Sequence, residues 1–363
     1  MWSTDFSGRY SAFTPQQRLL FPVRDSAEIT KKCLLKALLS GTCTGIAVLN
    51  PDDRGVLMLV RQTLHTALTK KPQLHRSSFT VVVGSSAAWA IETFSERVRD
   101  ITGHLQLEVL DVLLLARPPS LEVLMPTSQR KRLVLQHWEE MCSVQQRGLV
   151  RVIGVTDFTI QEMEFMFTSS PTSPPTVVSA TAGLAPARAR TTKPAIPDIS
   201  LRALVSFAHG HRMDVVICFA YHVLNDLPSQ LPLRDQWRQV VRTIAQRQRK
   251  EQFEVQVVHE AEQEAYHLEQ CDMKDTSTLQ TSTQIVLRYL WQKGVVVVPL
   301  PDSEDGGDQF TEEESHTVFH DLLHPFSSLP PARSPQVQYA SVLSKEELLL
   351  IDQVLPFMVS FTK

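Results

Sequence analysis

The sequence lacks the features that mark several large classes of protein. Its apolar runs, such as Val109–Ala116 and Val295–Leu300, are far shorter than the roughly 20 residues of a membrane-spanning helix. The formal net charge is only -3 and the pI is near 6.5, so electrostatics gives no reason to expect binding to nucleic acid or an anionic membrane. The cysteines are few, odd in number and widely spaced: Cys33, Cys43, Cys142, Cys218 and Cys271. This pattern argues against a disulfide-rich secreted scaffold and indicates reduced thiols in the cytoplasm.

The first 25 residues show no secretory signal pattern. Their arginines, serines and threonines would suit an organelle transit segment, but Asp5 and Asp25 argue against one. We therefore expect residues 1–25 to form a disordered leader and residues 26–363 to form a single domain. A transit segment stays open as the alternative.

Short β-rich runs alternate with helical patterns along the chain. These runs are Thr44–Asn50, Phe79–Gly84, Leu107–Ala116, Val150–Thr156, Val215–Tyr221 and Val295–Pro299. Such alternation predicts βαβ units and a parallel sheet. The chain has 363 residues, 43% of them hydrophobic, which suffices for the single large core of an α/β barrel. The expected fold class is therefore α/β, a (β/α)8 barrel of the TIM type.

Three stretches interrupt this alternation. They are a Pro-, Ser- and Thr-rich stretch at Thr168–Pro197, a charged helical insertion at Leu231–Gln270 and an acidic loop at Ser303–Glu314. Within the first stretch, we expect a flexible loop around Ala185–Pro194, between a strand and a helix. The insertion follows the run Val215–Tyr221, which places it on the C-terminal face, where barrels of this type carry their functional loops.

Four segments resemble a known family in the family's own order. They are Leu110–Pro118, His137–Phe158, Thr283–Pro299 and Leu343–Leu348. They resemble the aldo-keto reductase patterns "LDYLDLYLIHRP", "W..ME.L...G..R.IGVSNF", "QVLLRWLLQRGVVVIPKS" and "LSEEEL". The resemblance covers roughly residues 40 to 355 and implies a barrel of the aldo-keto reductase type. In that family a tyrosine, tuned by a lysine, an aspartate and a histidine, acts as general acid while a nicotinamide transfers hydride to a carbonyl.

The resemblance places those four catalytic groups on unsuitable residues. The aspartate falls on Ala47, the tyrosine on about Asp52, the lysine on Val83 and the histidine on Ala116. Valine cannot carry a charge or lower a neighbour's pKa, and alanine cannot donate to a carbonyl. We therefore expect no catalytic residue of the family type.

The family's cofactor groups are altered as well. The "PKS" loop that binds the 2′-phosphate falls on Pro299–Asp305, where three carboxylates would repel a phosphate. The pair that holds the carboxamide falls on Thr156 and Asp157, and an ionised aspartate cannot donate a hydrogen bond. Tyr221 matches the tyrosine that stacks on nicotinamide. We expect no cofactor, with residual NADPH binding at Thr156, Asp157 and Tyr221 as the alternative.

Further motifs resemble one branch of the superfamily, the regulatory subunit of glutamate–cysteine ligase. They are Leu49–Arg54 against "INPDER", Ala116–Pro119 against "ASPP", His137–Met141 against "YWEELE" and Ile153–Phe158 against "IGTSDL". The resemblance implies a noncatalytic protein that forms a heterodimer with the catalytic subunit of the ligase in glutathione biosynthesis. It implies partner contacts through Asp52, Arg117 and Asp157.

The same residues have structural interpretations. Asn50, Pro51 and two aspartates form a good helix start, and Asp157 could cap a helix that begins near Thr159. Two other functions stay open: a divergent NADP-dependent aldo-keto oxidoreductase, and a barrel scaffold in another protein complex.

No metal site is expected. His259, Glu260, Glu264 and His267 share one charged helix, but the sequence is not the His-Glu-x-x-His of zinc hydrolases, because residue 263 is a glutamine.

Overall fold

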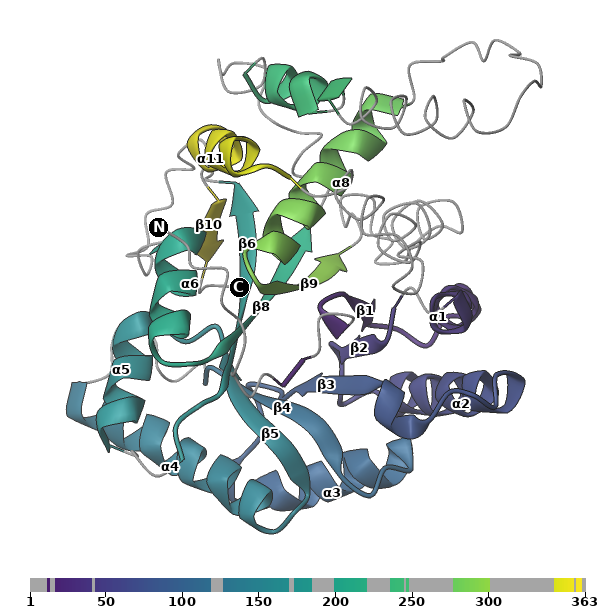
Figure 1. Cartoon of the computed structure of the whole chain (residues 1–363). Coiled ribbons are helices and arrows are strands. Elements are labelled where there is room, and N and C mark those ends of the chain that lie inside the picture. Colours follow the sequence, from purple (N-terminus) through teal and green to yellow (C-terminus); the bar gives the residue numbers. More distant parts are fainter. Residues whose placement is uncertain are drawn as a thin grey trace.

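Eight parallel strands form a nearly closed barrel that helices surround (Figure 1). The computed structural model describes residues 12–13, 17–40, 43–118, 127–169, 173–184, 199–220, 236–244, 246–247, 277–300, 343–355 and 357–360. The barrel strands are β1 (Leu20–Val23), β2 (Gly45–Val48), β3 (Thr80–Gly84), β4 (Leu110–Ala116), β5 (Val150–Thr156), β6 (Val177–Leu184), β8 (Asp214–Ala220) and β9 (Val295–Leu300). Each pairs in parallel with the next. The barrel closes through a bridge between Leu19 and Val297.

The described helices alternate with these strands. They are α1 (Glu28–Ser40), α2 (Arg54–Lys70), α3 (Phe94–Leu105), α4 (Thr127–Gln146), α5 (Ile160–Ser169), α6 (Leu201–Gly210), α8 (Ser277–Gln292) and α11 (Lys345–Val354). Two 3-10 turns, η2 (Arg76–Ser78) and η3 (Ile91–Thr93), precede β3 and α3. The βαβ alternation that the sequence predicts is confirmed, and β5 has the expected bounds because most of its residues are β-branched.

A C-terminal strand extends the sheet in a way that the sequence patterns did not indicate. Strand β10 (Phe357–Ser360) pairs antiparallel with the second half of β6, and the short β7 (Ile199–Ser200) pairs with β10. Strand β10 has room to pair with β6 because β5 pairs only with the first residues of β6, up to Ser179. The longer β6 therefore offers a free edge beyond the barrel, and β10 covers it.

The core has two layers. Between the strands and the helices lies a large apolar cluster that includes Phe21, Val83 and Trp138. A smaller cluster fills the barrel interior, where the side chains of alternate strand residues meet. Phe13, only 2% exposed, belongs to this interior cluster, and the neighbouring Ala12 N–H donates to Asp214 at the start of β8 (2.6 Å).

The predicted leader is therefore too long. Leu20–Val23 forms β1, and Phe13 is buried in the barrel. The error arose because a strand of only four residues, buried throughout, has neither the length nor the alternation that marks a strand in sequence.

Two further observations concern membrane-spanning helices and the state of the cysteines. Among the described helices, none combines the length and the hydropathy that a membrane crossing requires. Cys33, Cys43, Cys142 and Cys218 are free thiols.

Candidate functional site

The C-terminal ends of the barrel strands carry the positions where the sequence resemblance puts catalysis. Ala47 packs in the barrel interior, 3% exposed. On β4, Val112 and Leu114 also face inward, so Ala116, two residues further on, faces the mouth of the barrel. Its backbone N–H donates to Ser85 Oγ (2.8 Å). Ala47 therefore lies inside the barrel and Ala116 at its mouth, and neither side chain can donate a proton.

The position assigned to the lysine needs a correction. Val83 belongs to the outer cluster between strands and helices, whereas Val82 belongs to the barrel interior. Because strand side chains alternate, the residue of β3 that faces the mouth is Gly84. A Cβ at Gly84 would meet no atom within 4 Å. Val83 therefore faces away from the mouth, and Gly84, which faces it, has no side chain that could titrate.

The next strands supply only neutral groups to the mouth. Thr156 pairs with Ala116 on one side and with Ser179 on the other. Ser179, which stands where the family has a glutamine, is buried. Cys218 packs partly against the interior cluster. Among the described inward-facing residues at the C-terminal ends of β2 to β8, there is no carboxylate, amine, guanidinium or imidazole.

Asp52 lies just outside the mouth, in the loop between β2 and α2. It is exposed, and its Oδ1 accepts a hydrogen bond from Nε1 of the buried Trp89 (2.8 Å). Trp89 also packs edge-on against Phe94. Asp53, the next residue, accepts from the Gly55 N–H (2.7 Å) and caps α2. Asp52 thus joins two loops at the mouth, while Asp53 accounts for the helix start.

Asp157 adopts a left-handed backbone conformation, with φ of 63°. Its N–H donates to the Ser179 carbonyl (3.0 Å), which fixes the end of β5 against β6. Thr159 caps α5, since the Glu162 N–H donates to Thr159 Oγ1 (3.2 Å) and the Thr159 N–H donates to Glu162 Oε2 (2.9 Å). The Thr-x-x-Glu capping box was present in the sequence as a signal for this start.

Arg117, at the end of β4, is held inside the protein. Its Nε and Nη2 donate to the carboxylate of Glu162 at 3.0–3.1 Å. The two side chains are 11% and 19% exposed. Its predicted role as a partner contact is untested. In the structure, its guanidinium forms an ion pair that joins β4 to α5. Glu162 itself was missed by sequence reasoning.

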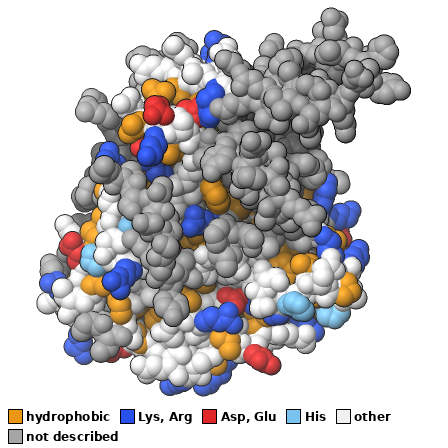
Figure 2. All heavy atoms as spheres, viewed as in Figure 1, with side chains coloured by type: hydrophobic (Ala, Val, Ile, Leu, Met, Phe, Trp, Pro, Cys, Tyr) orange, Lys and Arg blue, Asp and Glu red, His pale blue; other side chains and the backbone are white. Residues whose placement is uncertain are grey.

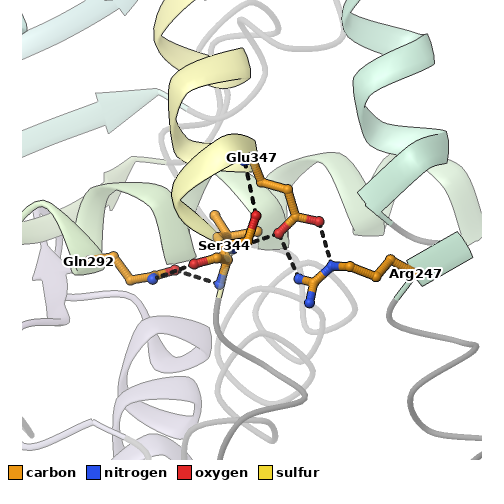
Figure 3. A network of polar contacts seen from close by, with 5 residues as sticks. Arg247, Gln292, Ser344 and Glu347 are labelled. Atoms are coloured by element: carbon orange, nitrogen blue, oxygen red, sulfur yellow. Dashed lines mark hydrogen bonds and ion pairs between the residues drawn. The ribbon is translucent and has the colours of Figure 1, made fainter.

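The charged insertion is better packed than the sequence suggests. Residues 236–244 and 246–247 are helical, and Trp237, Val240, Val241 and Ile244 are buried in the outer core. Arg247 donates two hydrogen bonds to Glu347 of α11 (2.7 and 2.6 Å). Figure 3 shows this pair beside Ser344, which caps α11, and Gln292 of α8. This part of the insertion is thus anchored on the helical layer.

A second ionic contact joins the same helices. Asp352 of α11 accepts hydrogen bonds from Tyr289 Oη and from Lys293 Nζ, the latter at 2.8 Å. Burial raises the pKa of Tyr289, and the Asp352 carboxylate adds to the effect. Gln292 completes the contact, with bonds of 3.0 and 2.8 Å to the backbone of Leu343.

Several predicted features lie outside the described residues. They are Tyr221, the loops at Ala185–Pro194 and Ser303–Glu314, and the candidate metal residues near His259. Among the described residues, no group of three or more His, Cys, Asp or Glu side chains is placed to hold a metal ion.

Several solved aldo-keto reductases share this architecture. An aldo-keto reductase of the silkworm, Bombyx mori, matches with a TM-score of 0.59 and 16% identity, over 93% of this chain and 83% of that chain. The chain has the aldo-keto reductase fold. The same reductase complexed with NADPH matches with a TM-score of 0.58 and 16% identity, over 93% and 84% of the chains. An aldo/keto reductase from Brucella melitensis matches with a TM-score of 0.55 and 14% identity, over 93% and 94%.

At these identities the likeness establishes the fold alone. No protein-family model matches the chain, and no curated protein matches it significantly in sequence. The function must therefore be argued from the site.

Proposed function

We propose that this protein is a noncatalytic barrel of the aldo-keto reductase type that acts as the regulatory subunit of glutamate–cysteine ligase in the cytoplasm. The observation that carries the first half of the proposal is the neutral mouth of the barrel. General acid catalysis needs a group that can give up a proton within hydrogen-bond reach of the substrate. Ala47, Gly84 and Ala116 cannot do so.

The second half of the proposal rests on the sequence resemblance. The motifs at Leu49–Arg54 and Ile153–Phe158 lie in the structure on the loops that follow β2 and at the end of β5. Both belong to the C-terminal end of the barrel. A partner that docks on this end would meet Asp52 directly, since that side chain is exposed.

A regulatory subunit acts through a difference in affinity for two states of its partner. Adding this protein to the purified catalytic subunit should therefore change the Michaelis constant for glutamate or the sensitivity to glutathione feedback. The two chains should also co-elute as a heterodimer in size-exclusion chromatography. The proposal would be refuted if the two chains did not co-elute and the kinetics of the catalytic subunit did not change.

Charge reversal at Asp52 locates the interface. Asp52→Lys should weaken the heterodimer by about tenfold or more, as expected for a charge at an interface. Asp52→Asn keeps an oxygen that accepts from Trp89, and it separates the loss of charge from the loss of this hydrogen bond. Glu96→Lys, at an exposed position of α3, is the matched control and should leave binding unchanged.

A second candidate is a divergent NADP-dependent oxidoreductase. The observation that favours it is the shared fold with a reductase complexed with NADPH. Asp52 would then serve as the general acid, since the resemblance aligns it approximately with the family's catalytic tyrosine. NADPH-dependent carbonyl reduction that Asp52→Ala abolishes would establish this candidate. A third candidate, a scaffold in another complex, would be identified by mass spectrometry of co-purifying chains if the ligase does not bind.

A further inference from the structure

The region that includes the first two helices is strongly basic. Residues 28–91 contain eight lysines and arginines but only three acids, Glu28, Asp52 and Asp53, an excess of five positive charges in a chain whose net charge is -3. The cations are Lys31, Lys32, Lys36, Arg54, Arg61, Lys70, Lys71 and Arg76. The rest of the chain therefore carries a net charge of -8.

The fold brings these cations to one side of the molecule. Helices α1 and α2 pack against each other as neighbours in the helical layer. Lys32 and Lys36 lie one turn apart on the exposed face of α1, while Arg54 and Lys70 are exposed at the two ends of α2. Figure 2 shows basic and histidine side chains on the side of the molecule where Figure 1 places these helices. We call this side the α1–α2 basic surface.

Most of this charge is not neutralised within the protein. The two aspartates of the region form contacts within the protein, since Asp53 caps α2 and Asp52 accepts a hydrogen bond from Trp89. Among the cations, Arg76 is paired with Asp111 (2.6 Å) and Lys31 lies 3.8 Å from Glu28. No ion pair forms within the described part of the chain at Lys32, Lys36, Arg54, Lys70 or Lys71.

We propose that the α1–α2 basic surface docks an acidic surface or acidic segment of a partner protein. Opposite charges across an interface speed association and select the partner. The five unpaired cations supply such a field over two helices. The proposal does not depend on the proposed function, because it rests on the charge of this surface and not on the sequence resemblance that carries the proposed function.

Other polyanions fit the surface less well. A nucleic acid is bound by a continuous basic path, often with aromatic residues on which bases stack. Neither α1 nor α2 contains an aromatic residue, and a long polyanion would extend over the acidic remainder of the protein. A membrane surface is bound with apolar side chains that enter the lipid. Among the described residues, the exposed large apolar side chains are Leu349 and Leu350, on α11.

Fluorescence anisotropy with a labelled peptide of alternating glutamate and glycine tests the proposal on the full-length protein. The peptide should bind at about 50 mM salt and dissociate at about 500 mM salt, where charges are screened. Reversing four cations, Lys32→Glu, Lys36→Glu, Lys70→Glu and Lys71→Glu, should weaken binding by about tenfold or more. The matched control reverses four exposed cations on α3 and α4: Arg97→Glu, Arg99→Glu, Lys131→Glu and Arg132→Glu. It should change binding by less than about twofold.

Three outcomes would overturn the proposal. They are no binding of the peptide by the wild type, an equal loss in the control variant, and tighter binding of a DNA duplex or of vesicles containing phosphatidylserine than of the peptide. If charge reversal unfolds the protein, as circular dichroism would reveal, the same four lysines are changed to glutamine. Neutralisation should still weaken binding and should leave the helices intact.

Discussion

The mouth of the barrel and the helical layer around it use polar residues in opposite ways. Near the mouth, the described inward-facing residues Ala47, Gly84, Ala116 and Thr156 carry no group that titrates. In the outer layer, charged side chains form partly buried pairs, such as Arg117 with Glu162 and Arg247 with Glu347. These pairs hold secondary-structure elements together.

This contrast indicates what the fold retains. Buried ion pairs persist only when geometry and additional hydrogen bonds compensate for the loss of hydration. Glu162 and Glu347 meet that requirement in the same way, because each also accepts the N–H of the residue that caps its helix. The described ion pairs of this kind thus belong to the outer layer, and Ala47, Gly84 and Ala116 supply no group that could act as a general acid.

Breaking the pair on α11 should give the largest effect on stability. Glu347→Ala removes both bonds to Arg247 and half of a capping box, and it should lower the free energy of unfolding by about 3 kcal/mol. Urea denaturation measures this loss. Glu346→Ala is the control, because Glu346 is a fully exposed neighbour on the same helix turn. An equal loss in both variants would show that the pair contributes nothing specific.

Removing the cation at the end of β4 should have a smaller effect. Arg117→Met leaves Glu162 half-buried but still bonded to the Thr159 N–H, so we expect a loss of about 1–3 kcal/mol. The double change Arg117→Met with Glu162→Met should recover part of it, since no unpaired charge remains. If Arg117→Met leaves stability unchanged but abolishes partner binding, Arg117 is an interface residue after all.

Alkaline pH should weaken the contact between α8 and α11. The pKa of Tyr289 is raised by burial and by Asp352, so the folded state favours the neutral phenol. Stability from this group is complete below the ordinary tyrosine pKa of about 10 and falls as pH rises beyond it, by at most about 1.4 kcal/mol per pH unit. Urea denaturation between pH 8 and 11 should show a steeper decline for the wild type than for Tyr289→Phe. Parallel curves would contradict this account.

Restoring a cation at the mouth should have the smallest effect. A side chain at Gly84 meets open space, so Gly84→Lys should change stability by less than about 1 kcal/mol. The variant should not acquire reductase activity, because Ala47 and Ala116 remain. A large loss of stability would show that the position is not open, and our assignment of the inward face would be wrong.

The sequence predicted the barrel better than it predicted the roles of single residues. The strands were visible because buried parallel strands are rich in β-branched residues, as in Val150–Thr156. The four-residue β1 and the C-terminal β10 were missed because short segments have no measurable period. Val83 was placed one residue out of register, and such a shift moves a side chain to the opposite face of the sheet.

The predicted partner contacts show a different limit. Sequence patterns identify a residue type, but they do not show which distant side chain it meets. Arg117 finds Glu162, 45 residues away, and Asp52 finds Trp89, 37 residues away. Only the three-dimensional fold reveals these partners, and it shows that Arg117 is paired with Glu162 within the protein.

The central claim is that the mouth of this barrel does not catalyse carbonyl reduction. The most direct test is to incubate the purified protein with NADPH and a panel of aldehydes and ketones and to follow the absorbance of the reduced nicotinamide. The account predicts no consumption above the rate without protein, and no quenching of nicotinamide fluorescence at micromolar cofactor. Turnover that disappears in Asp52→Ala or Tyr221→Phe would contradict it and would identify the protein as a reductase with an unusual acid.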